Sequence, residues 1–185
     1  VTGIPQKLPV NENHIGAPIT IYDLHKLTAE NYLSYYINQV CARGAILRLS
    51  NVYGPGPASS SCDRGILNLM IHKAMAKEPL TVYGAGNYLR DYIYVEDAAC
   101  AFLTAAVNIE RINGRCFVIG SGQGHTITEA INLVADRSAI KTGRRVDIVY
   151  IEPKTAQSPI EQRNFIADSG EFFRATGWKT KVSLI

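Results

Sequence analysis

Two side chains that can exchange protons, Tyr22 and Lys26, stand four residues apart in ITIYDLHKLTAENYLSYYINQV, residues 19–40. On a helix, at about 100° per residue, both fall on one stripe, with Asp23 and Glu30 outside it. The rest of this stripe is Ala29, Leu33, Tyr36, Ile37 and Val40. An ammonium on a core-facing stripe loses hydration. We therefore expect Lys26 either to meet a polar group in a cleft or to reach past the core to water.

The segment that follows this helix predicts a ligand-binding loop. GAILRLS, residues 44–50, is a nearly continuous apolar run, which is typical of a parallel strand buried on both faces. The glycines and prolines of NVYGPGP, residues 51–57, must then break the regular structure. Open α/β sheets bind ligands beyond the carboxyl ends of their strands, so we expect a binding site at this loop.

The remaining elements alternate between helices and short apolar strands, which predicts an α/β protein. Helical spacing of apolar residues covers residues 64–77. RDYIYVEDAACAFLTAAV, residues 90–107, should be extended through Val95 and helical from about Asp97, with Asp97 as the N-cap. The other expected elements are a strand LTVY at 80–83, a turn GAGN at 84–87 and a buried strand CFVIG at 116–120.

The glycine cluster GSGQG, residues 120–124, does not predict a dinucleotide site. The fingerprint G-x-G-x-x-G needs a third small residue, and His125 occupies that position. Thr126 and Glu129 instead form a capping-box pattern, T-x-x-E, that opens a helix through Val134.

A second capping-box pattern predicts the last helix of the chain. It runs from Asp168 to Glu171, and Gly177 should end the helix before Trp178.

The composition excludes several classes of protein. With 185 residues, 46% of them hydrophobic, the chain can bury a core. Its 19 basic and 16 acidic residues are scattered, which argues against a nucleic-acid or membrane-surface partner. The four cysteines have no metal-ligand spacing, so we expect no metal site and reduced thiols in a cytoplasmic protein. No apolar run approaches the roughly 20 residues of a membrane span.

Four local patterns occur in a telling order: Y-D-L-H-K, R-L-S-N-V-Y-G-P, R-D-Y-I-Y-V-E-D, and R-N-F-I-A-D followed by A-T-G-W. In that order they resemble the extended short-chain dehydrogenase/reductases that modify nucleotide sugars, the NAD-dependent epimerases and dehydratases. The resemblance implies the C-terminal portion of a Rossmann-like doubly wound parallel sheet with a smaller α/β substrate-binding lobe. Residues 1–53 and 91–120 would belong to the Rossmann-like core, and residues 54–90 and 121–185 to the lobe.

The resemblance implies that Tyr22 is the catalytic base and Lys26 its partner, both beside NAD, with NADP as the alternative cofactor. A free phenol, with a pKa of about 10, is a poor base at neutral pH. A neighbouring ammonium and a positive nicotinamide ring favour its ionised form. By the same likeness Leu49, Ser50 and Val52 would lie along the cofactor.

The same resemblance implies the residues that bind a nucleotide-diphosphate sugar. They would be Asn51, Asn68, Leu69, Thr81, Tyr83, Arg90 and Arg163, the two arginines binding the diphosphate through paired hydrogen bonds.

Several of these residues could instead have a purely structural role. Asn51 could be a turn residue bonded to its own backbone. Asn68 could be exposed, and LTVY could be an ordinary strand. Arg90 could pair with Asp91 or Glu96.

In one respect the chain departs from the family. No glycine fingerprint precedes Tyr22, and residues 1–3 read V-T-G where the family reads V-Y-G. The resemblance therefore implies an absent N-terminal half that would hold most of the cofactor and the catalytic serine or threonine. We expect residues 1–185 alone to show no epimerase or dehydratase turnover.

A second apolar face of the first helix indicates a contact with a second copy of the chain. Ile21, Leu24, Thr28, Tyr32 and Tyr35 form this face, roughly opposite the first stripe. A helix that is apolar on two sides needs two partners. Members of the resembled family pair through this helix, so we expect a homodimer through residues 22–40.

Two other functions remain as alternatives to the epimerase or dehydratase. One is a non-catalytic dinucleotide-binding sensor of the same fold. The other is a reductase of a smaller carbonyl substrate.

Overall fold

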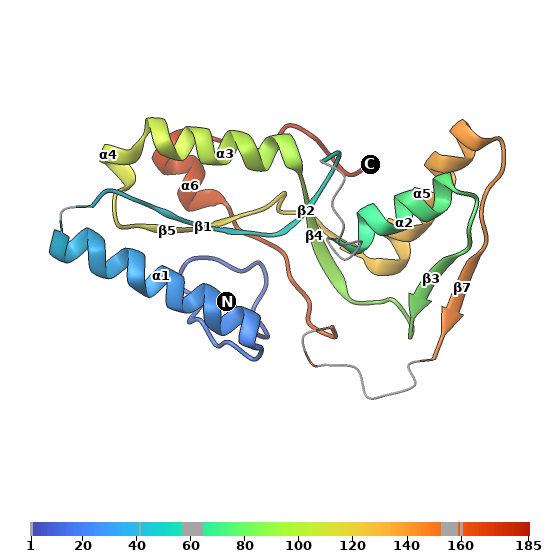
Figure 1. The fold of residues 1–185 in the computed structure, drawn as a ribbon, viewed down its shortest axis with the longest axis horizontal. Coiled ribbons are helices and arrows are strands. Elements are labelled where there is room, and N and C mark those ends of the chain that lie inside the picture. Colours follow the sequence, from blue (N-terminus) through green and yellow to red (C-terminus); the bar gives the residue numbers. More distant parts are fainter. Residues whose placement is uncertain (1, 41, 57–64, 153–158, 160) are drawn as a thin grey trace.

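The computed structural model describes residues 2–40, 42–56, 65–152, 159 and 161–185, and it shows an α/β protein with two bodies joined by a short sheet (Figure 1). In chain order the elements are α1 (Ile21–Val40), β1 (Ile46–Leu49), β2 (Asn51–Tyr53), α2 (Ile66–Met75), β3 (Leu80–Tyr83), β4 (Leu89–Tyr94), α3 (Val95–Val107), α4 (Ile109–Ile112), β5 (Cys116–Ile119), β6 (Gly124–Thr126), α5 (Ile127–Thr142), β7 (Ile148–Ile151) and α6 (Gly170–Thr176). This order confirms the predicted fold class.

The first body is a parallel pair of strands between two layers of helix. β1 pairs with β5, with Ile46 opposite Cys116, while α3 and α6 lie on one side and α1 on the other (Figure 1). Its core includes Ile93, Ala101, Ile119, Phe172 and Trp178. A half-buried ion pair, Arg48 to Glu30 at 2.7 Å, fastens α1 to β1.

The second body is a two-stranded parallel sheet, β3 with β7, against which α2 and α5 pack. Its core includes Leu67, Met70, Leu80, Val82 and Ala135. A third sheet, in the order β2-β4-β6, joins the two bodies. β4 contributes to both cores, because Ile93 packs in the first and Tyr92 in the second.

The chain returns to the first body after β7. Phe172 of α6 stacks edge-on against Phe117 of β5, with ring centroids 5.1 Å apart, and Trp178 lies beside Phe172. Val10 and Ala167 form a parallel bridge. The predicted division placed all of residues 121–185 in the lobe. The packing of Phe172 and Trp178 instead places α6 with the core of the first body.

The caps of the helices differ in part from the predictions. The box of Thr126 and Glu129 is confirmed, and its helix α5 continues to Thr142. The Asp97 cap is wrong, because α3 begins at Val95 and the buried Asp97 carboxylate binds the backbone N–H groups of Lys181 and Val182.

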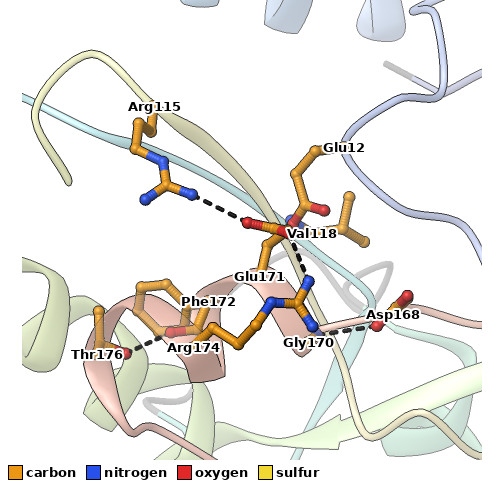
Figure 2. A network of polar contacts seen from close by, with 9 residues as sticks. All are labelled: Glu12, Arg115, Val118, Asp168, Gly170, Glu171, Phe172, Arg174 and Thr176. Atoms are coloured by element: carbon orange, nitrogen blue, oxygen red, sulfur yellow. Dashed lines mark hydrogen bonds and ion pairs between the residues drawn. The ribbon is translucent and has the colours of Figure 1, made fainter.

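The predicted box of Asp168 and Glu171 is also wrong. The N-cap of α6 is Ser169, and Asp168 accepts the N–H of Gly170 at 2.9 Å. Figure 2 shows where Glu171 goes instead: its carboxylate binds the guanidinium groups of Arg115 and Arg174. Two nearby cations offer a charged carboxylate more than one backbone N–H can. Gly177 ends the helix in the left-handed conformation, as predicted.

The predicted stripe of α1 packs on the first body only in part. Leu33 and Ile37 are half-buried, and a Cβ atom added to Gly44 would lie 3.0 Å from the Leu33 side chain. Tyr22, Lys26 and Ala29, at the start of the stripe, are exposed, whereas Asp23 is only 3% exposed and Leu27 is half-buried. The first turns therefore bury residues outside the stripe. No helix in the described ranges is long and apolar enough to cross a bilayer.

Candidate active site

A cavity of about 590 Å³ lies between α1 and the end of β1. Its volume falls in the range of sites for small molecules and cofactors. The side chains of interest that line it are Thr2, Tyr22, Lys26, Leu49, Ser50, Asn51, Val52 and Arg163. Its walls therefore come from segments that are distant in the sequence but are brought together by the packing of α1 on β1.

Tyr22 and Lys26 project from the first turns of α1 into this cavity. The Nζ atom of Lys26 lies 5.5 Å from the centroid of the Tyr22 ring. An ammonium at that distance from a ring centroid makes a cation–π contact. Both side chains are exposed, so the Lys26 ammonium keeps contact with water. Lys26 also lies at a cavity, as one of the two expectations for it required.

Ser50, a residue of the cavity wall, has a buried hydroxyl group that lacks a partner in the described part of the chain. The residue is 8% exposed, and its Oγ atom has no hydrogen bond to any described residue. Its backbone N–H donates to Ile119 O at 2.8 Å, which fixes the junction of β1 and β2. A buried hydroxyl without a partner costs about 1–3 kcal/mol, so a polar group of a ligand would stabilise it.

Arg163 and Arg90 form a pair of half-buried cations. Arg163 lines the cavity and donates to Gly3 O at 3.3 Å. Arg90 donates to the carbonyl groups of Leu89, Glu161 and Arg163. Burial lowers the pKa of both guanidinium groups, and the charge of Arg163 lowers the pKa of Arg90 further.

Neither arginine forms an ion pair with a carboxylate in the described part of the chain. The interpretation of Arg90 as a partner of Asp91 is wrong, because hydrogen bonds from Ser121, Gly122 and Ala167 occupy the Asp91 carboxylate. Two neighbouring cations that donate hydrogen bonds to carbonyl groups can still bind an anion.

The other predicted substrate residues lie outside the lining of this cavity. Asn68 is half-buried on α2, and its Oδ1 atom accepts the N–H of Gly54 at 3.2 Å, so it supports the loop after β2. Leu69 packs against the core of the lobe. Thr81 and Tyr83 lie on β3, where Tyr83 is exposed.

Asn51, in contrast, lines the cavity. It is a strand residue opposite Tyr92, which overturns its interpretation as a turn asparagine.

Asp23 is a buried residue of the cavity wall that the sequence analysis missed. Its N–H donates to Thr20 Oγ1 at 3.1 Å, an N-cap of α1 that the threonine immediately before Ile21 could have revealed. Burial acts to raise the pKa of the Asp23 carboxyl. Hydrogen bonds, including one with Thr20, and nearby positive charges together outweigh burial and lower this pKa, and the charge of Arg163 is the smallest of these causes.

Comparison with known proteins gives one family. The model of the NAD dependent epimerase/dehydratase family matches residues 1–120. A putative UDP-glucose 4-epimerase of Methanocaldococcus jannaschii is 28% identical and matches 100% of this chain but 56% of its own length. A dTDP-L-rhamnose 4-epimerase of Burkholderia thailandensis is 30% identical, over 90% of this chain and 44% of its own. The chain thus spans about half the length of the curated relatives it matches.

Solved structures show the same likeness. A UDP-glucose 4-epimerase of Thermotoga maritima, determined with UDP-glucose, aligns with a TM-score of 0.81 at 28% identity, over 99% of this chain and 57% of that one. A UDP-glucose 4-epimerase of Thermus thermophilus, determined with NAD, aligns with a TM-score of 0.78 at 25% identity, over 98% and 56%.

Proposed function

Because the chain belongs to the NAD dependent epimerase/dehydratase family, we propose that it carries the catalytic pair and the substrate-side residues of a nucleotide-sugar epimerase or dehydratase. The observation that supports this most is the cavity that Tyr22 and Lys26 share with Ser50 and Arg163. The names of the relatives, which include UDP- and dTDP-sugar enzymes, support the same class of substrate.

The residues at the cavity fit the nicotinamide end of NAD(P). The buried hydroxyl of Ser50 can bond a polar group, and Lys26 is free of ion pairs in the described part of the chain. Leu49 and Val52 would line the ring, and Lys26 would hold the ribose hydroxyl groups. When bound, NAD(P) supplies the hydride acceptor.

Tyr22 is the proposed base. Its ionised phenol takes the proton of a sugar hydroxyl, and the Lys26 ammonium stabilises the negative oxygen before that transfer. Loss of the proton prepares the sugar carbon for oxidation to a transient keto group. The same phenol can return the proton when the carbonyl group is reduced.

The proposed substrate contacts extend from the cavity to the lobe. Arg163 and Arg90 bind the diphosphate, whose charge offsets the repulsion between the two guanidinium groups. Asn51 lines the cavity and would reach the sugar. The remaining contacts in this proposal are Asn68, Leu69, Thr81 and Tyr83, with the last two beside the base.

The specific features of this cavity favour catalysis on a nucleotide sugar over the two alternatives. A dinucleotide sensor has no need of both Tyr22 and Lys26. A reductase of a small carbonyl compound has no need of Arg90 and Arg163. The same family resemblance, with the exposed second face of α1, supports the proposal of a homodimer.

Calorimetric binding of UDP and dTDP, against uridine and thymidine, tests the proposed substrate class. The arginine pair should make each diphosphate bind at least about tenfold more tightly than its nucleoside. Arg163→Ala and Arg90→Ala should each remove most of that preference. The control is Arg43→Ala, which alters only an exposed pair with Glu110. Equal affinities of nucleoside and diphosphate for the unaltered protein would contradict the proposal.

A further inference from the structure

The buried carboxylate of Asp91 follows Arg90 directly on β4 and does not line the cavity. It is 1% exposed. Its Oδ1 atom accepts the N–H and the hydroxyl of Ser121, both at 2.8 Å, and its Oδ2 atom accepts the N–H groups of Gly122 and Ala167, both at 3.0 Å. A buried charge is tolerated when hydrogen bonds of this number satisfy it. Asp91 thus fastens two other segments to β4.

One of these segments carries Arg163. We name residues 161–168 the arginine segment; it runs along β4 and is held at successive positions. Leu89 accepts the N–H of Phe165 at 3.1 Å and donates its own N–H to Asn164 Oδ1 at 2.7 Å. Arg90 binds the carbonyl groups near the start of the segment, and Asp91 binds Ala167 near its end.

The packing around Asp91 leaves little room for movement. A Cβ atom added to Gly120 would lie 2.7 Å from Asp91 Oδ2 and 2.5 Å from the Ala167 side chain. Gly120 is therefore needed for this close approach. The carboxylate, the glycine turn and the arginine segment consequently form one tightly packed unit.

We propose that Asp91 is a positioning residue for the diphosphate site: by fixing Ala167 and the turn at Ser121 and Gly122, it holds Arg163 beside Arg90. This inference rests on the proposed role of the two arginines. Like charges repel, so two guanidinium groups stay together only where the backbone that carries them is fixed. Asp91 supplies that restraint from inside the protein without touching the ligand.

Asp91→Asn is the variant that tests the inference. An asparagine keeps the shape of the side chain but has only one oxygen that accepts hydrogen bonds. Its NH₂ group would face backbone N–H donors, with which it cannot form hydrogen bonds. By calorimetry, UDP should bind about tenfold more weakly, while uridine should change by less than about twofold.

Asp97→Asn is the matched control. Asp97 is also buried, 4% exposed, and its Oδ2 atom accepts the N–H groups of Lys181 and Val182 at 3.0 and 2.9 Å. Asp97 holds residues 181 and 182, which lie outside the arginine segment. Its variant should lose stability to a similar degree, measured by thermal unfolding, yet keep the preference for UDP over uridine.

The outcomes separate this inference from the proposed function. If the unaltered chain shows no preference for UDP, the proposed function fails. If the unaltered chain prefers UDP to uridine and Asp91→Asn retains this preference, the positioning role is overturned. It is also overturned if Asp91→Asn and Asp97→Asn lose the preference equally.

Ser121→Ala serves if Asp91→Asn does not fold. It removes one donor to Asp91 and keeps the carboxylate. The preference for UDP should then fall by about threefold. An unchanged preference in a folded Ser121→Ala protein would equally overturn the inference.

Discussion

Polar side chains that are buried or half-buried differ in whether the protein itself satisfies them. Ser50 Oγ has no partner in the described part of the chain, whereas the hydroxyl of Ser169 both accepts from Gly120 N and donates to Gly120 O. Asp91 receives four hydrogen bonds. A satisfied group holds the structure together, whereas a buried group without a partner gives no such restraint.

Ser50→Ala should therefore not destabilise the ligand-free protein. The substitution removes a buried oxygen that forms no bond, and the free energy of unfolding in urea should stay constant or rise by up to about 1 kcal/mol. Ser169→Ala is the control and should lower it by about 1 kcal/mol, because it leaves Gly120 groups unpaired. A larger loss for Ser50→Ala than for Ser169→Ala would show that the hydroxyl has a structural partner.

At the scale of the element, local patterns predicted α2, β3, β5 and the start of α5, because each follows from periodicity or capping within a few residues. They failed where a distant segment supplies the partner. The Asp97 carboxylate binds residues 181 and 182, and Glu171 binds Arg115. Neither contact is visible in a local pattern, because both depend on the return of the chain to the first body.

The capping box of α5 carries a prediction on stability and pH. Thr126→Ala removes the side-chain cap and should lower the free energy of unfolding by about 1 kcal/mol. The backbone N–H of Thr126 donates to the Glu129 carboxylate at 2.8 Å, and hydrogen bonding by Thr126 lowers the pKa of this carboxyl.

The folded state binds the Glu129 proton less tightly than the unfolded state does. The contribution of Glu129 to the free energy of unfolding should therefore be present above about pH 4.5 and be lost as the pH falls through the lowered pKa. Urea unfolding at pH 7 and pH 3 measures it. The difference between the unaltered protein and Glu129→Gln should shrink at the lower pH, because the carboxylate that accepts the Thr126 N–H is then protonated. A constant difference would contradict a contribution from the carboxylate, and Thr142→Ala, near the other end of α5, is the control.

On the scale of the whole molecule, the family motifs predicted the fold class. Four of the residues they nominated, Tyr22, Lys26, Asn51 and Arg163, line one cavity of the structure, while their roles stay a prediction. They could not show that β4 serves both bodies or that α6 returns to the first, because these features arise from long-range packing. They also left the face of α1 undecided. The exposed second face includes Ile21, at 74%, and Tyr32, at 63%.

This exposed face predicts the oligomeric state. Light scattering should show a dimer at micromolar concentration, because Ile21, Leu24, Tyr32 and Tyr35 present an apolar surface that a second copy would cover. Tyr32→Glu should give a monomer. Leu103→Glu, on the exposed face of α3, should leave the dimer intact. A monomer from the unaltered protein would remove the proposal.

The most direct test of the central claim is the rate of sugar oxidation by the natural protein with Tyr22→Phe, followed by the absorbance of reduced nicotinamide. The substitution removes one oxygen, so UDP binding should be unchanged while the rate falls at least about a hundredfold. Tyr36→Phe, on the same helix, should keep the normal rate. An unchanged rate with Tyr22→Phe would contradict the claim that this phenol, beside Lys26, begins the reaction.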